Sequence, residues 1–224
     1  MRLFSKKILL PLLVGSLLLT GCSSNKIQEQ KKTVYAMDTI MDLTAYTDNS
    51  DVLNDAEKKI NEIDKELRRG SQESEIYAVN NNEETKLTDE TAYIVETALN
   101  IGKKTRGAFD ITIAPVMDLW GFYNQNFYVP TDDEIKNALK NVDYSKVSIK
   151  DNVISKPKET QVDLGGIAKG YTSDTIIKLL KDEGVTSAII SLGGNVQTLV
   201  QNLTAIFGKW LYKTPLTKIN MSVV

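Results

Sequence analysis

A strand–helix–strand run in the second half of the chain limits its fold more than any other feature. The segment Val162-Asp163-Leu164 reads as a strand and leads directly into Gly165-Gly166. Paired glycines let the backbone approach a ligand closely, and a helix that starts there presents free N–H groups. This helix is expected to end near Gly184, and a buried strand over 188–192 follows, closed by Gly193-Gly194-Asn195. We therefore expect an α+β domain with a mixed sheet and packed helices.

Hydrophobic spacing predicts most of the other elements. Residues 33–46 are rich in Thr, Ile, Val and Tyr and predict one or two strands. Apolar residues at spacings of three and four from Leu53 to Leu67 predict one buried helix face, with Gly70 as the stop. The remaining expectations are a helix over 89–104, a helix opened by a capping box at Thr131 and Glu134, and a hairpin that turns at Asp151-Asn152.

Residues 1–21 are predicted to be a lipoprotein signal peptide. Three basic residues precede an apolar run over 8–19, which is shorter than the roughly 20 residues that a membrane-spanning helix needs. The run ends in Leu19-Thr20-Gly21-Cys22, which resembles a bacterial lipobox. Lipidation of Cys22 would anchor the protein to the extracytoplasmic face of the bacterial cell membrane, with 22–32 as a tether. An ordinary cleaved signal with a chance Cys is the alternative.

The amino-acid composition excludes several classes of catalytic and metal site. The chain has 224 residues, no His and one Cys, and it carries 27 Lys plus Arg against 29 Asp plus Glu. This charge balance argues against nucleic-acid binding, which usually needs a basic surface. Without His, neither a Ser-His-Asp triad nor a His-ligated zinc site can form. A bound metal would instead be a hard cation, Mg or Ca, held by oxygen atoms.

Charged residues flank the Gly165-Gly166 turn. Asp163 can accept a hydrogen bond from a ribose hydroxyl or a base edge, and Lys169 can place a cation near phosphate. Turns of this kind are also common as mere packing features. The segment is neither a Walker A loop nor a GxGxxG loop, so the pattern alone does not identify a ligand.

Three further segments offer contacts to a flat ligand. Gly107 and Ala108 leave room beside Phe109 for a ring, and Asp110 offers an acceptor, although a core strand with an aromatic plug would read the same way. Met37 suits a polarisable contact with a ring system. The turn over 191–195 exposes backbone at the end of a strand, where ligands tend to bind in open α/β sheets.

Taken together, these segments closely resemble the FAD:protein FMN transferase family over residues 33–199. The motifs that carry the resemblance are Gly107-Ala108-Phe109-Asp110, Leu119-Trp120-Gly121-Phe122, the run from Val162 to Gly170, and Leu192-Gly193-Gly194. Ser74-Glu75-Ile76 with Asn80 matches a further family segment. The resemblance implies an extracytoplasmic, Mg-dependent enzyme that splits FAD, releases AMP and moves FMN onto a Thr or Ser hydroxyl. The acceptor would be a flavin-carrying subunit of a membrane redox complex.

The resemblance also implies roles for individual residues. Contacts to FAD would come from Met37, Ala108, Phe109, Asp110, Asp163 and Lys169. The backbone oxygen of Gly166 would help to hold Mg. Many members carry a Tyr shortly before the Ser-Glu-Ile segment, at the position of Gly70 in this chain. Catalytic residues are expected in a later family segment, so none is assigned among these positions.

The tail over 200–224 departs from the family pattern. Members continue with a His-containing stretch and an Asp-Ala-x-Ser-Thr stretch that supplies further Mg ligands, and neither occurs here. From Phe207, degenerate codons in another frame permit Trp-Lys-Val-Ala-Ile-Gln-Asn-Pro, which is close to the family sequence. We therefore expect an out-of-frame tail and a C-terminally truncated domain. Poor solubility and little activity would follow. A naturally short paralogue is the alternative.

A second function remains open. A non-catalytic lipoprotein that binds FAD or another nucleotide would show the same glycine-rich turns. The distinguishing feature would be a carboxylate and a hydroxyl close to Gly166, which a catalytic metal site requires and a binding protein does not.

Overall fold

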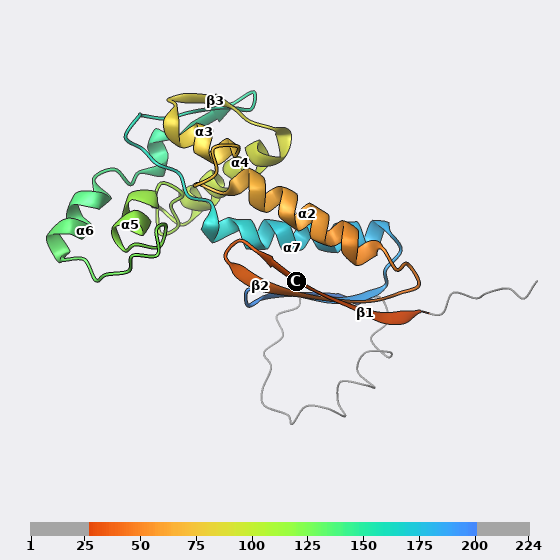
Figure 1. Ribbon diagram of the computed structural model, residues 1–224. Coiled ribbons are helices and arrows are strands. Elements are labelled where there is room, and N and C mark those ends of the chain that lie inside the picture. Colours follow the sequence, from red (N-terminus) through yellow and green to blue (C-terminus); the bar gives the residue numbers. More distant parts are fainter. Residues whose placement is uncertain (1–26, 201–224) are drawn as a thin grey trace, which may run out of the picture.

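The computed structural model describes residues 27–200 (Figure 1). The signal peptide, Cys22 and the tail over 201–224 lie outside the described residues. In chain order the elements are β1 (Gln28–Ala36), β2 (Thr39–Thr47), α2 (Val52–Leu67), α3 (Glu75–Asn81), β3 (Glu84–Lys86), α4 (Asp89–Lys104), α5 (Ala114–Leu119), α6 (Asp132–Leu139), the 3-10 turn η2 (Tyr144–Lys146), β4 (Ser148–Lys150), β5 (Val153–Ser155), α7 (Gly165–Asp182), β6 (Ser187–Leu192) and β7 (Asn195–Val200).

The larger sheet has four strands in the order β1-β2-β6-β7, and each neighbouring pair is antiparallel. The expected α+β class is confirmed. The region 33–46 forms two strands, because a two-residue turn at Met37-Asp38 reverses the chain. Both turn residues have positive φ, 49° and 55°, which is the conformation that a tight hairpin turn demands and that residues other than Gly rarely adopt. The predicted tether over 22–32 is wrong for its last five residues, since β1 begins at Gln28 and pairs with β2 from there.

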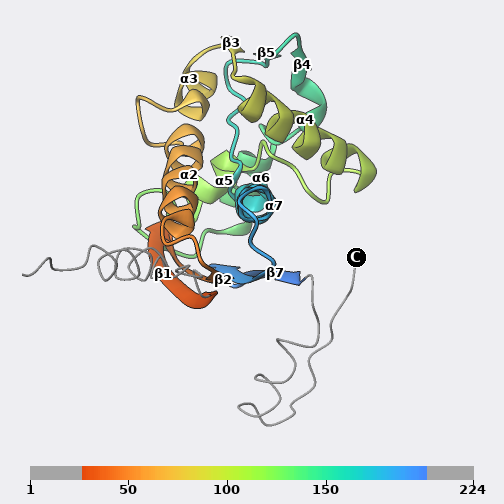
Figure 2. The same cartoon turned by 90° about the vertical axis from the view of Figure 1, so that its right-hand side faces the viewer.

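Helices α2 and α7 lie side by side over one face of this sheet (Figures 1 and 2). The predicted apolar face of α2 is confirmed: Leu53, Ala56, Ile60, Ile63 and Leu67 are all buried. The N-terminal part of that face packs with Met41 and Leu43 of β2, and with Ile176 of α7, in one hydrophobic cluster. The sheet therefore fixes the axis of α7, the helix that begins at the paired glycines.

A second cluster lies beyond α2 and α7, away from the four-stranded sheet. It joins the C-terminal end of α2 to α3, α4 and the residues leading into α7, and its members include Ile76, Ile94, Ile111 and Leu164. A small antiparallel sheet in the order β3-β5-β4 adjoins this cluster, and its Ile154 is buried. The predicted helix over 89–104, capping box and hairpin are all confirmed.

One predicted strand is wrong, and one observed strand was not predicted. Val162-Asp163-Leu164 belongs to no strand, because the side chain of Asn80 bonds both backbone groups of Val162 in place of a neighbouring strand. Strand β7 follows the turn at Gly193-Gly194, where the sequence indicated only an end. Among the described helices, none is both long and apolar enough to cross a membrane.

Candidate functional site

The start of α7 is the point where the predicted site residues gather. Leu164 caps the helix without a side-chain hydrogen bond. The carboxylate of Asp163 fills that role, since its Oδ1 accepts a bond of 2.8 Å from the N–H of Gly165. Both Gly165 and Gly166 are exposed. The N–H of Gly166 and the positive end of the helix dipole thus lie at an accessible surface, which favours an anionic ligand.

Two distant segments hold this turn in place. The N–H of Asp163 donates to the carbonyl of Ile111 over 2.7 Å, joining the turn to the segment that carries Phe109 and Asp110. On the other side, Asn80 of α3 accepts from the N–H of Val162 and donates to its carbonyl, over 2.7 and 2.9 Å. The turn is therefore fixed by hydrogen bonds to both neighbours.

Phe109 lies directly against the paired glycines. A Cβ atom added to Gly166 would come within 2.9 Å of Cε2 of the Phe109 ring. Glycine at this position is therefore required by space, because no larger residue fits without moving the ring. The ring is half-buried and packs against the second cluster, so a flat surface borders the helix N-terminus.

Asp110 is occupied by bonds within the protein. Its Oδ1 accepts from the N–H and hydroxyl of Thr112, over 2.8 and 2.6 Å, and its Oδ2 accepts from the N–H of Tyr144 over 2.9 Å. These bonds fix the loop that holds Phe109. The structure therefore gives Asp110 a positioning role, while Ala108 is exposed beside it.

Met37 and Lys169 lie along the first turns of α7. The hydroxyl of Thr172 is 3.8 Å from the sulfur of Met37, which places the β1–β2 turn beside the helix. Asn195, in the turn before β7, donates to the carbonyl of Lys169 over 3.3 Å. The ammonium of Lys169 makes no hydrogen bond or ion pair with any residue between 27 and 200, so it is a free cation one turn into α7.

Arg69 completes the site, and sequence reasoning missed it. Its Nη1 lies 3.2 Å from Oδ2 of Asp163, and its Nη2 lies 3.0 and 2.9 Å from the two oxygens of Asp118. Burial works to lower the pKa of Arg69, but the two carboxylates outweigh it and the pKa is raised. The ring of Tyr123 stacks on the guanidinium at 5.2 Å and covers Gly70. The two carboxylate partners are 94 and 49 residues away in sequence, so no local sequence pattern predicts these contacts.

The assignment of the Gly166 backbone oxygen as a Mg ligand stays a prediction, because the other ligands are expected in a later family segment. Among residues 27–200, no three His, Cys, Asp or Glu side chains come together as a metal site. Asp163 is the carboxylate nearest Gly166 in sequence, and it is already engaged by Arg69 and Gly165. A complete acidic metal site is therefore not present within residues 27–200.

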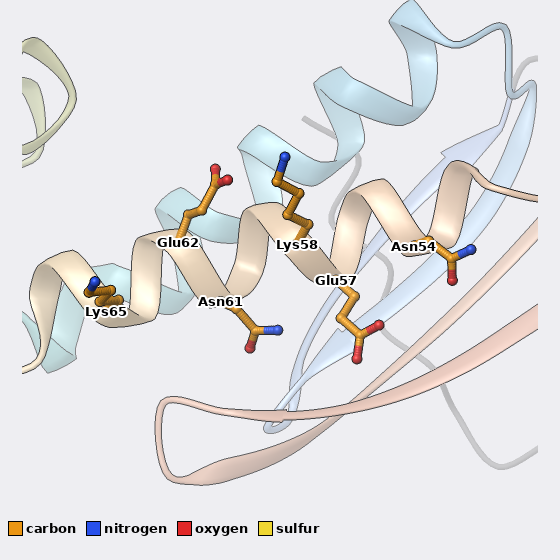
Figure 3. Close-up of a pocket in the computed structure, with 6 residues that line it drawn as sticks. All are labelled: Asn54, Glu57, Lys58, Asn61, Glu62 and Lys65. Carbon is orange, nitrogen blue, oxygen red and sulfur yellow. The ribbon is translucent and has the colours of Figure 1, made fainter.

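One hollow in the described surface lies away from the predicted site residues. It runs along the outer face of α2 and is lined by Asn54, Glu57, Lys58, Asn61, Glu62 and Lys65 (Figure 3). Its charged side chains extend outward from a single helix, and no predicted site residue takes part. We interpret it as the solvated face of α2.

Comparisons with known proteins identify the family of this chain. The model of the ApbE family matches residues 37–210. An FAD:protein FMN transferase of Vibrio cholerae is 26% identical over 198 residues, which cover 83% of this chain and 58% of the relative. One from Escherichia coli K12 is 31% identical over 123 residues, 52% of this chain and 35% of the relative. The chain therefore spans less than two thirds of the length of these relatives.

Solved structures give the same result. The ApbE protein of Thermotoga maritima superimposes with a TM-score of 0.72 at 27% identity, covering 77% of this chain and 59% of that one. The flavin transferase ApbE of Vibrio cholerae has the same fold, with a TM-score of 0.72 at 24% identity and coverage of 79% and 60%. Because the family model matches most of the sequence and the fold agrees, this chain belongs to the ApbE family.

Proposed function

We propose that this protein acts in FAD:protein FMN transfer. The observation that carries the proposal is the meeting of Asp163, Gly165-Gly166 and Phe109 at the start of α7. It combines an anion-binding helix N-terminus with an aromatic ring that lies against it. FAD has both of the groups that such a site favours, a pyrophosphate and flat rings. Relatives that share this region are named FAD:protein FMN transferases.

In the proposed reaction, FMN moves from FAD to a hydroxyl of an acceptor protein. The oxygen of an acceptor Thr or Ser attacks the phosphorus on the FMN side of the pyrophosphate. A P–O bond forms, the bond to the bridging oxygen breaks, and AMP leaves with that oxygen. The hydroxyl proton passes to a base, which we place outside residues 27–200.

The described residues contribute binding and charge neutralisation. The N–H of Gly166 and the positive end of the α7 dipole face the pyrophosphate, and Lys169 adds a cation close by. Phe109 contacts a ring, while Asp110 fixes the loop that holds Phe109. Ala108 leaves space beside that ring, and Met37 offers its sulfur to the ligand. Phosphoryl transfer depends mainly on positioning and charge, so this set suits the reaction without a His.

Mg is part of the proposed function. The backbone oxygen of Gly166 would be one ligand. Its other ligands would have to come from outside the described residues, because no carboxylate set is present within them.

We further propose that Cys22 anchors the protein by lipid at the extracytoplasmic face of the cell membrane. Two or three acyl chains on one residue would hold a protein stably at a bilayer. The acceptor would then be a flavin-carrying subunit of a membrane redox complex, which presents its Thr or Ser near the same surface.

A non-catalytic flavin-binding lipoprotein is the second candidate. It would use the same residues at the start of α7 to bind the nucleotide, and the absence of a group of three acidic side chains within residues 27–200 is compatible with it. The two candidates differ in whether flavin becomes covalently attached to another protein.

The deciding experiment incubates the full chain with FAD, Mg and an acceptor domain that carries a flavinylation Thr. In-gel flavin fluorescence after denaturation then reports covalent transfer. Transfer that requires the acceptor Thr and stops with EDTA supports the transferase. FAD binding by titration, with no fluorescent acceptor band, supports the binding protein instead. An acceptor with Thr→Ala is the matched control.

A further inference from the structure

Tyr123 presents an open aromatic face beside the start of α7. It lies in the loop between α5 and α6, and 55% of its surface is exposed. One part of the ring is held by Arg69, whose Cζ lies 5.2 Å from the ring centroid. A cation over one face leaves the opposite face available to another flat group.

The Tyr123 ring packs so closely on Gly70 that a side chain at position 70 would displace it. A Cβ atom at Gly70 would lie 2.6 Å from Oη of Tyr123 and 3.1 Å from its Cε2. Gly70 does not have a positive φ, so its backbone alone does not demand glycine. What demands glycine is the ring of Tyr123, which occupies the space where any side chain at position 70 would begin.

A single guanidinium connects this ring to the helix N-terminus. Arg69 stacks on Tyr123 and bonds Oδ2 of Asp163 over 3.2 Å, while Oδ1 of Asp163 accepts from Gly165. Two aromatic rings therefore border the paired glycines: Phe109 by direct contact and Tyr123 through Arg69. A dinucleotide has two flat rings joined by a pyrophosphate, which matches two ring surfaces on either side of an anion-binding turn.

We propose that Tyr123 is a ligand-contacting residue that stacks on one ring of FAD. The proposal rests on the proposed function, because it takes FAD as the ligand of this site. Gly70 supports it by leaving room for the ring, and Arg69 supports it by fixing the ring orientation. Separate titrations with FMN, which carries the isoalloxazine ring, and with ADP, which carries adenine, show which of the two rings stacks on Tyr123.

The test is equilibrium titration of FAD with the full chain, followed by flavin fluorescence. Stacking is worth about 0.5–1.5 kcal/mol, so Tyr123→Ala should weaken binding roughly threefold to tenfold. If Tyr123 stacks on the isoalloxazine ring, Tyr123→Ala should also reduce the quenching of flavin fluorescence. Loss of a purely structural contact would not change this quenching. Tyr123→Phe keeps the ring and should bind within about twofold of the native chain.

Two further variants test the geometry. Phe127→Ala removes another exposed ring of the same loop, 64% exposed and packed on Phe122, and should leave FAD binding unchanged. Gly70→Ala should weaken binding by displacing Tyr123. The double variant Gly70→Tyr with Tyr123→Gly offers a ring from the opposite side and should recover part of the affinity.

The outcomes separate this proposal from the proposed function. If the native chain binds FAD, and Tyr123→Ala binds FAD, FMN and ADP as tightly with the same quenching, the role of Tyr123 is overturned and the function stands. If the native chain binds no FAD, both are overturned. Circular dichroism checks folding, and Tyr123→Leu replaces Tyr123→Ala if the smaller side chain destabilises the loop.

Discussion

Arg69 and Asp163 are 94 residues apart in sequence, yet Nη1 of Arg69 lies 3.2 Å from Oδ2 of Asp163. The same guanidinium binds both carboxylate oxygens of Asp118. It thereby joins the loop after α2 to α5 and to the start of α7. Because Asp163 uses its other oxygen to accept from Gly165, the ion pair also sets the orientation of the residue that caps the site helix.

Replacing Arg69 should lower both stability and ligand affinity. Arg69→Met leaves two carboxylates without their counter-charge, and the Arg69 side chain is only 13% exposed. Loss of one partner of a fully buried pair costs about 3–5 kcal/mol. Asp118 is 44% exposed, so we expect a smaller decrease of about 1–3 kcal/mol in the free energy of unfolding. Urea denaturation measures it.

A surface pair supplies the control for this prediction. Lys178 and Asp182 form an exposed i,i+4 pair on α7, and such pairs contribute about 0.3–0.5 kcal/mol. Lys178→Met should therefore change stability by less than about 0.5 kcal/mol. A similar loss in both variants would show that the Arg69 bridge is no stronger than an ordinary surface contact.

Local patterns in the sequence predicted the parts of the fold that local physics determines. The spacing from Leu53 to Leu67 predicted α2 because one apolar face has to be buried against the sheet. The capping box at Thr131 and Glu134 predicted the start of α6, since both of its hydrogen bonds are made within four residues. The β1–β2 turn was not located, because neither Met37 nor Asp38 is the Gly or Asn that usually marks positive φ.

Long-range contacts explain what the sequence could not predict. The strand expected over 162–164 has the right apolar character, but a side chain, Asn80, takes the place of its partner strand. Phe109 and Gly166 were both predicted site residues, although their direct contact depends on how two segments pack. The sequence did not predict a role for Arg69, because an Arg after a helix follows no distinctive pattern. Its role depends on Asp118 and Asp163, which only the fold brings beside it.

Two glycines of α7 separate a site effect from a helix effect. A Cβ at Gly166 would press on the Phe109 ring at 2.9 Å, whereas a Cβ at Gly170 meets nothing within 4 Å. Gly170→Ala should raise stability by about 0.5–1 kcal/mol, because Ala favours a helix interior. Gly166→Ala should displace the ring and weaken FAD binding by roughly tenfold, an effect of about 1.4 kcal/mol. Fluorescence titration and thermal melting measure the two effects. Equal FAD affinity in both variants would contradict the assignment of Phe109 to the site.

Asn80 should be essential to the turn before α7. Its side chain makes two hydrogen bonds with Val162, at 2.7 and 2.9 Å. Asn80→Ala leaves these partly buried backbone groups without that partner, and each lost bond costs about 1 kcal/mol. We expect a decrease of about 2–3 kcal/mol in the free energy of unfolding, measured by urea denaturation. Asn81→Ala is the matched control, since the side chain of Asn81 donates one exposed bond to Tyr77, and it should cost less than about 1 kcal/mol.

Glu66 on α2 should make stability depend on pH. Burial raises its pKa above the ordinary 4.5, and the negative charge of Glu90 adds to this effect. The folded state therefore holds the proton more tightly than the unfolded state. The resulting stabilisation is complete below pH 4.5 and is lost as pH rises through the folded pKa. Glu66→Gln removes this dependence, so its stability relative to the native chain should be greater at pH 7 than at pH 4.

Glu73 provides a control of opposite sign. Its hydrogen bond and attraction to Lys65 lower its pKa below 4.5. Its stabilisation is therefore present above pH 4.5 and is lost as pH falls through the folded pKa. Glu73→Gln should accordingly lose stability relative to the native chain at pH 7, and this loss should shrink on acidification. Urea denaturation of the native chain and both variants at pH 4 and pH 7 measures the two trends. If the stability of both variants changed with pH in the same direction, partial burial could not be the cause of a raised pKa at Glu66.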